Sequence, residues 1–153
     1  MANPLTLVIP LREGADIQKL VGILVAQQDA IDAARREIAT IHFARFVLFD
    51  HSSPNLQPQP NSTGPFSLSV ITAYDGDFDV YIQDFVNHLG PAFSLLLSFS
   101  ATGQELLPLA EHVQGFVDWI RANDASQHGP NAQLRFYSAY PDTVQQVLAN
   151  SSG

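Results

Sequence analysis

The side chains best suited to chemistry in this sequence are its five histidines, and His112 is the most informative of them. His112 lies in an apolar helical pattern, one turn before Phe116 and near Trp119. An imidazole in apolar surroundings is typical of a proximal haem ligand. It is equally typical of a core histidine that hydrogen-bonds a backbone carbonyl. The sequence leaves both interpretations open, with haem as a candidate cofactor.

His88 belongs to a second helical pattern, which begins at Asp77. Asp77, Tyr81, Asp84 and His88 form a polar stripe beside the apolar one. Residues four apart are neighbours on a helix, so the Asp84 carboxylate can fix the tautomer of His88 and prepare it as a general base. The alternative is an exposed pair that contributes little to stability and nothing to catalysis.

The strand-like segment 41–50 carries two polar residues of interest, His42 and Arg45. Side chains alternate along a strand, so these two residues cannot serve one pocket unless a bulge lies between them. Arg45 stands on an otherwise apolar face and therefore needs a partner. We expect an internal ion pair with Asp75 or Asp50, and the alternative is an anionic substrate or an oxygen atom that Arg45 polarises.

Several aromatic side chains could line a pocket for a flat apolar ligand, and core packing is the alternative use for them. The candidate substrate-binding residues are His42, Tyr74, Tyr81, Phe116, Trp119 and Tyr137.

The carboxylates Asp75, Asp77 and Asp79 follow a D-x-D-x-D spacing that offers oxygen ligands to a cation. The segment lacks the glycine and the final glutamate of an EF-hand loop, where Val80 and Val86 stand instead. We therefore expect helix capping by Asp77 rather than a metal site.

Composition excludes several classes of function. The chain has no cysteine, which removes disulfides, thiolate catalysis and iron–sulfur clusters. Its net charge of −8 would repel nucleic acid. It contains no nucleophile elbow, no glycine-rich nucleotide loop and no zinc-type histidine pair. The first residues do not form a secretion signal, and no apolar run reaches the length of a membrane span, so we expect a cytoplasmic protein.

The order of predicted elements indicates one α+β domain over residues 1–153, a ferredoxin-like βαββαβ sandwich with extra helices. Period-two patterns predict four strands, Leu5 to Leu11, Ile41 to Asp50, Phe66 to Asp75 and Leu134 to Tyr140. Apolar spacing predicts one long or broken helix over about 16–39, a helix from Asp77 to a break at Gly90-Pro91, and a helix over 109–123. A short terminal helix is expected after Pro141-Asp142-Thr143. The Pro-rich segment 51–65 is predicted to be a surface loop.

The second predicted strand is apolar on both faces, with Phe43 and Val47 on one and Phe46 and Leu48 on the other. An antiparallel sheet with helices on one face usually presents polar residues on the other, whereas here we expect that outer face to carry the apolar residues Val8, Phe46 and Leu48. A second copy of the sheet is the simplest cover, which predicts a homodimer through sheet faces.

Three segments, IHFARFVLFD, ITAYDGDFDVYIQDF and FYSAYP, resemble a group of bacterial proteins in the dimeric α/β barrel superfamily. That superfamily includes cofactor-free monooxygenases, small isomerases and haem proteins. The resemblance implies a small-molecule enzyme, monooxygenase-like or haem-assisted, that oxidises a hydrophobic substrate in a pocket between helices and sheet. His112 or His88 would be its base or iron ligand, and Arg45 would bind an anion or polarise oxygen. The alternative is a non-catalytic ligand-binding or assembly module.

Overall fold

The computed structural model describes residues 2–151, a mixed α+β fold built on an antiparallel sheet. Its strands are β1 (Asn3–Pro10), β2 (Ile41–Asp50) and β3 (Phe66–Tyr74), in the spatial order β1-β3-β2. The α-helices of the described range are α1 (Ile17–Ala26), α2 (Gln28–Ile38), α3 (Phe78–Leu97), α4 (Val113–Asn123) and α5 (Val144–Ser151). The α+β class and the bounds of β2 agree with the sequence prediction.

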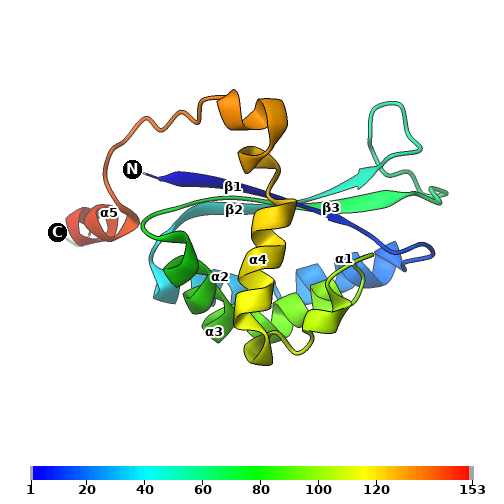
Figure 1. Cartoon of the computed structure of the whole chain (residues 1–153), viewed down its shortest axis with the longest axis horizontal. Helices are drawn as coiled ribbons and strands as arrows, with labels where there is room; N and C mark the ends of the chain where they lie inside the picture. Colours follow the sequence, from blue (N-terminus) through cyan, green and yellow to red (C-terminus); the bar gives the residue numbers. More distant parts are fainter. Residues whose placement is uncertain (1, 152–153) are drawn as a thin grey trace.

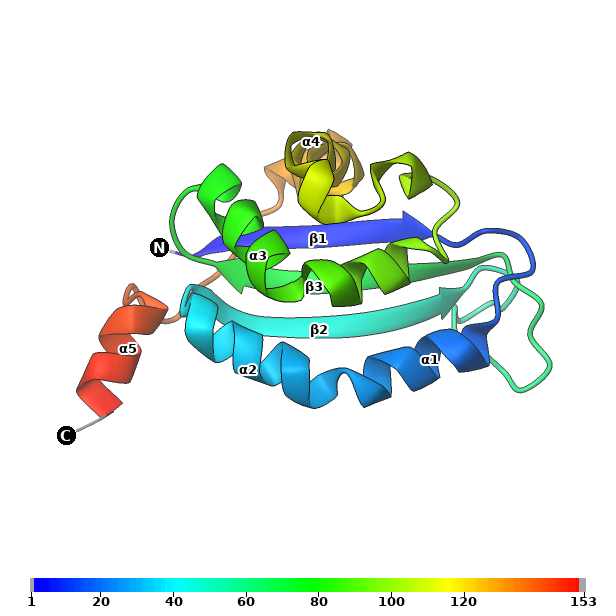
Figure 2. The ribbon, with the colours of Figure 1, turned by 90° about the horizontal axis from the view of Figure 1, so that it is seen from below.

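Helices α1 to α4 cover one face of the sheet, as Figures 1 and 2 show from two directions. Alternate residues of β1, namely Leu5, Leu7 and Ile9, are buried on this face. They pack with residues of β3 and of the helices in one hydrophobic core. Burial of this apolar stripe is what holds the helix layer to the sheet.

The opposite face, called here the open face, carries none of the helices α1 to α4, and the short helical turns Ala125–Gln127 and Gly129–Gln133 lie on this side (Figure 1). The strand register shows which residues lie side by side across this face. For example, Val8 of β1 and Val47 of β2 both pair with Ser69 of β3. Phe46 and Leu48 of β2 do not belong to it, because they pack against the core on the helix side. The sequence prediction that both residues face outward is therefore wrong, and the apolar residues that β2 contributes to the open face are Phe43, Val47 and Phe49.

The predicted helix over 16–39 is broken at Gln27 into two helices, α1 and α2. Asp16 caps α1 as predicted, because its side chain accepts the backbone N–H of Lys19 at 2.9 Å. Asp77 likewise caps α3, accepting from the backbone of Asp79 and Val80. Both caps satisfy backbone donors that the first helical turn leaves without partners.

Helix α3 does not end at Gly90-Pro91 but continues through Pro91 to Leu97. Phe93, Leu96 and Leu97 lie beyond the proline and are buried in the core, and this packing outweighs the backbone bond that Pro91 cannot make. α3 is 20 residues long, yet neither α3 nor any other helix within residues 2–151 has the length and apolarity that crossing a membrane requires.

The predicted outer strand from Leu134 to Tyr140 does not form. Residues 134–143 are a mostly exposed segment without helix or strand that leads to α5, and this segment with α5 is called the C-terminal tail. Part of the edge of β1 where a fourth strand would lie is occupied by Asp124, which forms an isolated bridge with Leu7. The tail begins over the open-face side of β1, where Leu134 and Phe136 line a hollow with Pro4 and Thr6.

Candidate functional site

A β-bulge at the start of β2 gives His42 an orientation that regular alternation would not. Ile41 pairs with Tyr74 and Phe43 pairs with Ala73, so His42 is an extra residue between two consecutive partners on β3. Bulges re-aim side chains and are frequent beside active sites. Here the bulge directs the imidazole toward Asp75, the residue that follows β3.

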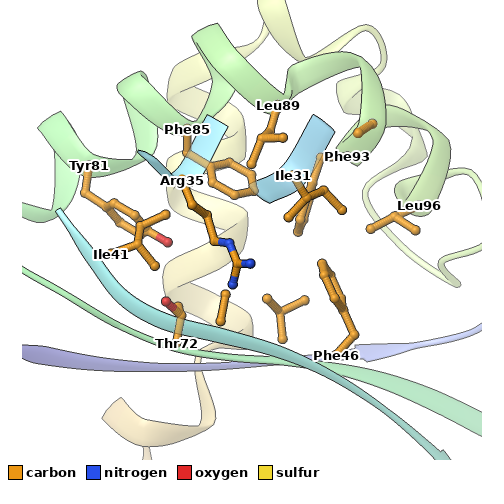
Figure 3. Close-up of a pocket in the computed structure, with 13 residues that line it drawn as sticks. Ile31, Arg35, Ile41, Phe46, Thr72, Tyr81, Phe85, Leu89, Phe93 and Leu96 are labelled. Atoms are coloured by element: carbon orange, nitrogen blue, oxygen red, sulfur yellow. The ribbon is translucent and has the colours of Figure 1, made fainter. Parts of the chain in front are cut away.

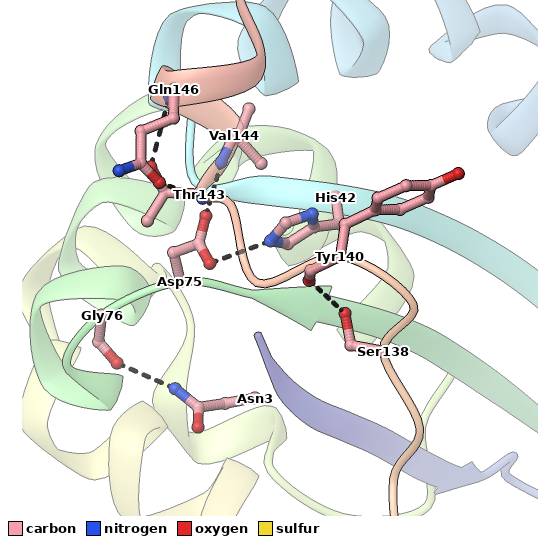
Figure 4. Close-up of polar contacts among 9 residues, drawn as sticks. All are labelled: Asn3, His42, Asp75, Gly76, Ser138, Tyr140, Thr143, Val144 and Gln146. Atoms are coloured by element: carbon pink, nitrogen blue, oxygen red, sulfur yellow. Dashed lines mark hydrogen bonds and ion pairs between the residues drawn. The ribbon is translucent and has the colours of Figure 1, made fainter. Parts of the chain in front are cut away.

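Asp75 is a buried carboxylate with both oxygens engaged (Figure 4). Its Oδ1 lies 2.8 Å from Nε2 of His42, and its Oδ2 accepts the backbone N–H of Val144 at 2.8 Å. The backbone N–H of Asp75 donates to the carbonyl of Thr40, also at 2.8 Å. These contacts fix the carboxylate between the sheet and the first residue of α5.

The His42–Asp75 pair has the chemistry of a general base. A carboxylate that accepts the Nε2 proton leaves Nδ1 of the ring as the proton acceptor. No residue in the described range hydrogen-bonds Nδ1 of His42. Tyr140 of the C-terminal tail, also drawn in Figure 4, is largely exposed. The pair can therefore take a proton from a molecule bound at this end of the sheet.

Arg45 does not form the predicted ion pair with Asp75 or Asp50. It is exposed on the open face, in register with Ile71 of β3, and no carboxylate of residues 2–151 lies within 4.0 Å of it. Asp75 binds His42 instead, and Asp50 accepts hydrogen bonds from Ser52. An exposed guanidinium stays hydrated, so it needs no protein partner.

His112 is exposed rather than buried in the apolar stripe, because α4 begins one residue later and His112 is its N-cap. Its Nδ1 lies 3.2 Å from the carbonyl oxygen of Pro108. A haem ligand needs an apolar cavity on its open side, and the apolar cavity of this fold does not include His112. The residues around His112 therefore do not fit a bound haem.

His88 is not paired with the carboxylate of Asp84. Its Nδ1 donates to the backbone carbonyl of Asp84 at 2.8 Å, and its Nε2 lies 3.6 Å from the carboxylate of Glu37 on α2. The pair that sequence spacing predicts is replaced by a local backbone bond and a contact between helices.

The aromatic candidates do not line one pocket. Tyr74 and Tyr81 stack at a centroid distance of 4.3 Å, and burial raises the pKa of Tyr81 to about 12. Phe116 is fully buried and stacks with Trp119 at 6.1 Å. Tyr137, by contrast, is 84% exposed on the C-terminal tail. Tyr74, Tyr81 and Phe116 are core residues, whereas Tyr137 lies outside the core.

The apolar cavity between the helices and the sheet is small (Figure 3). Its volume is about 30 Å³, whereas pockets for organic ligands span roughly 300–1,000 Å³. It is lined from α2, α3 and the sheet by side chains that include Ile31, Phe46, Tyr81, Phe85 and Phe93. The cavity is large enough for a molecule the size of water. A hydrophobic substrate would have to displace core side chains to enter it.

The sequence does not predict the partnership of His42 with Asp75. The two predicted strands, 41–50 and 66–75, have the same length, so no residue pattern marks the bulge. Asp75, Asp77 and Asp79 do not converge, and no group of three or more ligating side chains suited to a metal ion occurs within residues 2–151.

Comparison with known proteins gives no further assignment. No protein-family model, no curated protein and no solved structure matches this chain.

Proposed function

We propose that this protein is a small-molecule enzyme in which His42, held by Asp75, acts as the general base on a hydrophobic substrate. The observation that carries the proposal is the bulge that presents an imidazole to a buried carboxylate and leaves its Nδ1 without a protein partner. The substrate would lie on the open-face side, beside Phe43 and Tyr140, rather than in the small cavity under the helices.

In the proposed mechanism Nδ1 of His42 removes a proton from an activated C–H or O–H group. Asp75 then faces an imidazolium and stabilises its positive charge. In the monooxygenase-like version, the carbanion formed from an activated CH2 group reacts with O2. One oxygen atom becomes the carbonyl of the product and the other leaves as water, so the substrate supplies all four electrons. The haem-assisted version receives no support from the position of His112.

Oxygen uptake by metal-free protein with anthrone, whose CH2 is activated by two aromatic rings, tests this proposal. We expect turnover that falls about 10²–10⁴-fold in His42→Ala. Asp75→Asn should lower kcat more than it changes KM. His88→Ala is the matched control, since His88 is also a half-exposed histidine but bonds a backbone carbonyl. Equal activity in His42→Ala and His88→Ala would refute a base at His42.

A second candidate function, assembly of two copies into a dimeric α/β barrel, is favoured by a separate observation. The open-face positions of the strands carry one charged residue, Arg45, in a chain of net charge −8. The C-terminal tail adds the exposed apolar side chains of Leu134 and Phe136 on the same side. A surface low in charge and rich in aromatic residues is typical of the core of a protein interface.

Sedimentation of two matched variants tests the dimer. Phe43 on the open face and Leu95 on the helix layer are 46% and 45% exposed. Phe43→Asp should convert the dimer to a monomer, because it places a carboxylate in the apolar interface. Leu95→Asp should leave the dimer intact. A wild-type chain that stays monomeric at 100 μM or so would exclude this function while leaving the His42 proposal untouched.

A further inference from the structure

A second hollow lies at the same end of the sheet but on another side of it, between the start of β1, the start of α3 and the end of α4. Its volume is about 570 Å³, within the range of roughly 300–1,000 Å³ that organic ligands use. Pro4 and Phe78 supply apolar wall, and Tyr74, Asp77, Arg121 and Asp124 supply polar groups. We call this hollow the β1–α4 groove.

Two of its polar side chains are more than nine-tenths buried and keep an unused acceptor. Asp124 is 3% exposed, and its Oδ1 accepts from the backbone of Thr6 and from the backbone and hydroxyl of Ser126. No described residue hydrogen-bonds its Oδ2. Tyr74 is 6% exposed, and its phenol oxygen has no hydrogen-bond partner within residues 2–151 either. Within residues 2–151, neither oxygen is a fully enclosed atom without a partner, so both acceptors open into the groove, where a ligand can reach them.

The charge of the groove is negative. Burial first, and then the carboxylates Asp124, Asp77 and Asp79, raise the pKa of Tyr74, which places its phenol oxygen in their field. The only cation of the groove wall in the described chain, apart from histidine, is Arg121. Its guanidinium is already paired with Asp79 at 2.5 Å, lies 3.8 Å from Asp118 and covers the ring of Phe78. Arg121 is therefore not available to an anionic ligand.

We infer that the β1–α4 groove binds an organic ammonium ion, which donates N–H groups to Asp124 and Tyr74. Its apolar body rests against Pro4 and Phe78. A metal cation is a poorer occupant, because hard cations need six or more oxygen ligands and no group of three or more ligating side chains suited to a metal ion occurs within residues 2–151. An ammonium group is satisfied by two or three acceptors and gains from nearby aromatic rings.

Calorimetric titration with three ligands of one shape tests the inference: benzylamine, benzyl alcohol and benzoate. We expect benzylamine, cationic at pH 7, to bind saturably and the two others to bind at least tenfold more weakly. Tyr74→Phe should weaken benzylamine about tenfold, since it removes a bond to a charged donor. Asp124→Asn should abolish the preference for benzylamine over benzyl alcohol.

Tyr81→Phe is the matched control, because Tyr81 stacks on Tyr74 but lines the apolar cavity instead of the groove. Its affinity for benzylamine should equal that of the wild type. Thermal unfolding of each variant separates lost binding from lost structure. Saturable binding of benzyl alcohol as tight as that of benzylamine, or unchanged affinity in a folded Tyr74→Phe variant, would overturn the inference. Neither result depends on the base proposed at His42.

Discussion

Asp50 ends β2 with a side chain that is 1% exposed and held by its neighbours. The backbone N–H and the hydroxyl of Ser52 donate to its Oδ1 at 2.9 and 2.6 Å. Hydrogen bonds from Ser52 and Ser62 lower the pKa of Asp50 below its usual value of 3.8. A carboxylate with a lowered pKa favours the folded state above its unfolded pKa, and the benefit disappears as the pH falls through the folded value.

We therefore predict that the free energy of unfolding falls as the pH drops below about 4, and that Asp50→Asn flattens this acid dependence. Urea titrations at several pH values between 2.5 and 6 measure the effect. An acid dependence of stability that is the same in Asp50→Asn as in the wild type would contradict this prediction.

Phe116, a candidate for substrate binding, packs in the hydrophobic core instead. Its side chain is fully buried between Phe93 and Trp119. We predict that Phe116→Ala lowers the free energy of unfolding by about 3–5 kcal/mol, because it leaves a cavity that cannot fully collapse. Chemical denaturation measures this loss. Tyr137→Ala, which truncates an exposed ring, should change the stability of a single subunit by less than about 0.5 kcal/mol.

Pro91 lies inside α3 and is exposed. A substitution there changes the backbone hydrogen bonds of the helix rather than the packing of a side chain. A residue with a backbone N–H at this position could donate to the carbonyl of Asn87, which Pro91 cannot do. We predict that Pro91→Ala raises the free energy of unfolding by about 1–3 kcal/mol. A loss of stability in urea titrations would show instead that α3 needs a bend at this point to bury Phe93 and Leu97.

Elements that follow from local pattern are the ones that sequence predicts well. The bounds of β2 and the caps Asp16 and Asp77 rest on alternation and on capping chemistry, both of which are local. The continuation of α3 past Pro91 depends on tertiary packing, which no local rule contains. The strand from Leu134 to Tyr140 has the right residue types, but strand formation also needs a free edge. Asp124 and Ser126, which hydrogen-bond β1, occupy part of that edge.

In the candidate site, too, local features can be predicted from the sequence and tertiary contacts cannot. Sequence alone identified His42 and Asp75 as polar residues worth attention, because both stand out beside apolar strands. Their partnership depends on one bulge, which changes the direction of a side chain without changing the residue pattern. The helical pattern of the sequence begins at residue 109, four residues before α4 begins at Val113. This pattern therefore places His112 inside the helix, whereas in the structure it is the N-cap.

At the scale of the whole molecule, charge is distributed unevenly. Residues 125–153 contain one acidic side chain, Asp142, and one arginine, Arg135, whereas the rest of the chain holds the other 14 acidic residues. Two copies that meet through the open face would still repel each other, because each has a net charge of −8.

We predict that the dimer tightens when salt rises from 20 to about 300 mM, because salt screens this repulsion. Sedimentation at both salt concentrations measures the shift, and looser association at high salt would contradict an apolar interface.

The C-terminal tail has a consequence for how the chain would be digested. Leu134, Phe136 and Tyr137 lie on exposed backbone outside helices and strands, and chymotrypsin cleaves such backbone after large apolar residues that no proline follows. Brief digestion of dilute protein should therefore trim the chain within residues 134–140 and leave the sheet and α1 to α4 intact. If a second copy shields the tail, cutting should slow as the protein concentration rises, so one time course would report both the vulnerable segment and its protection.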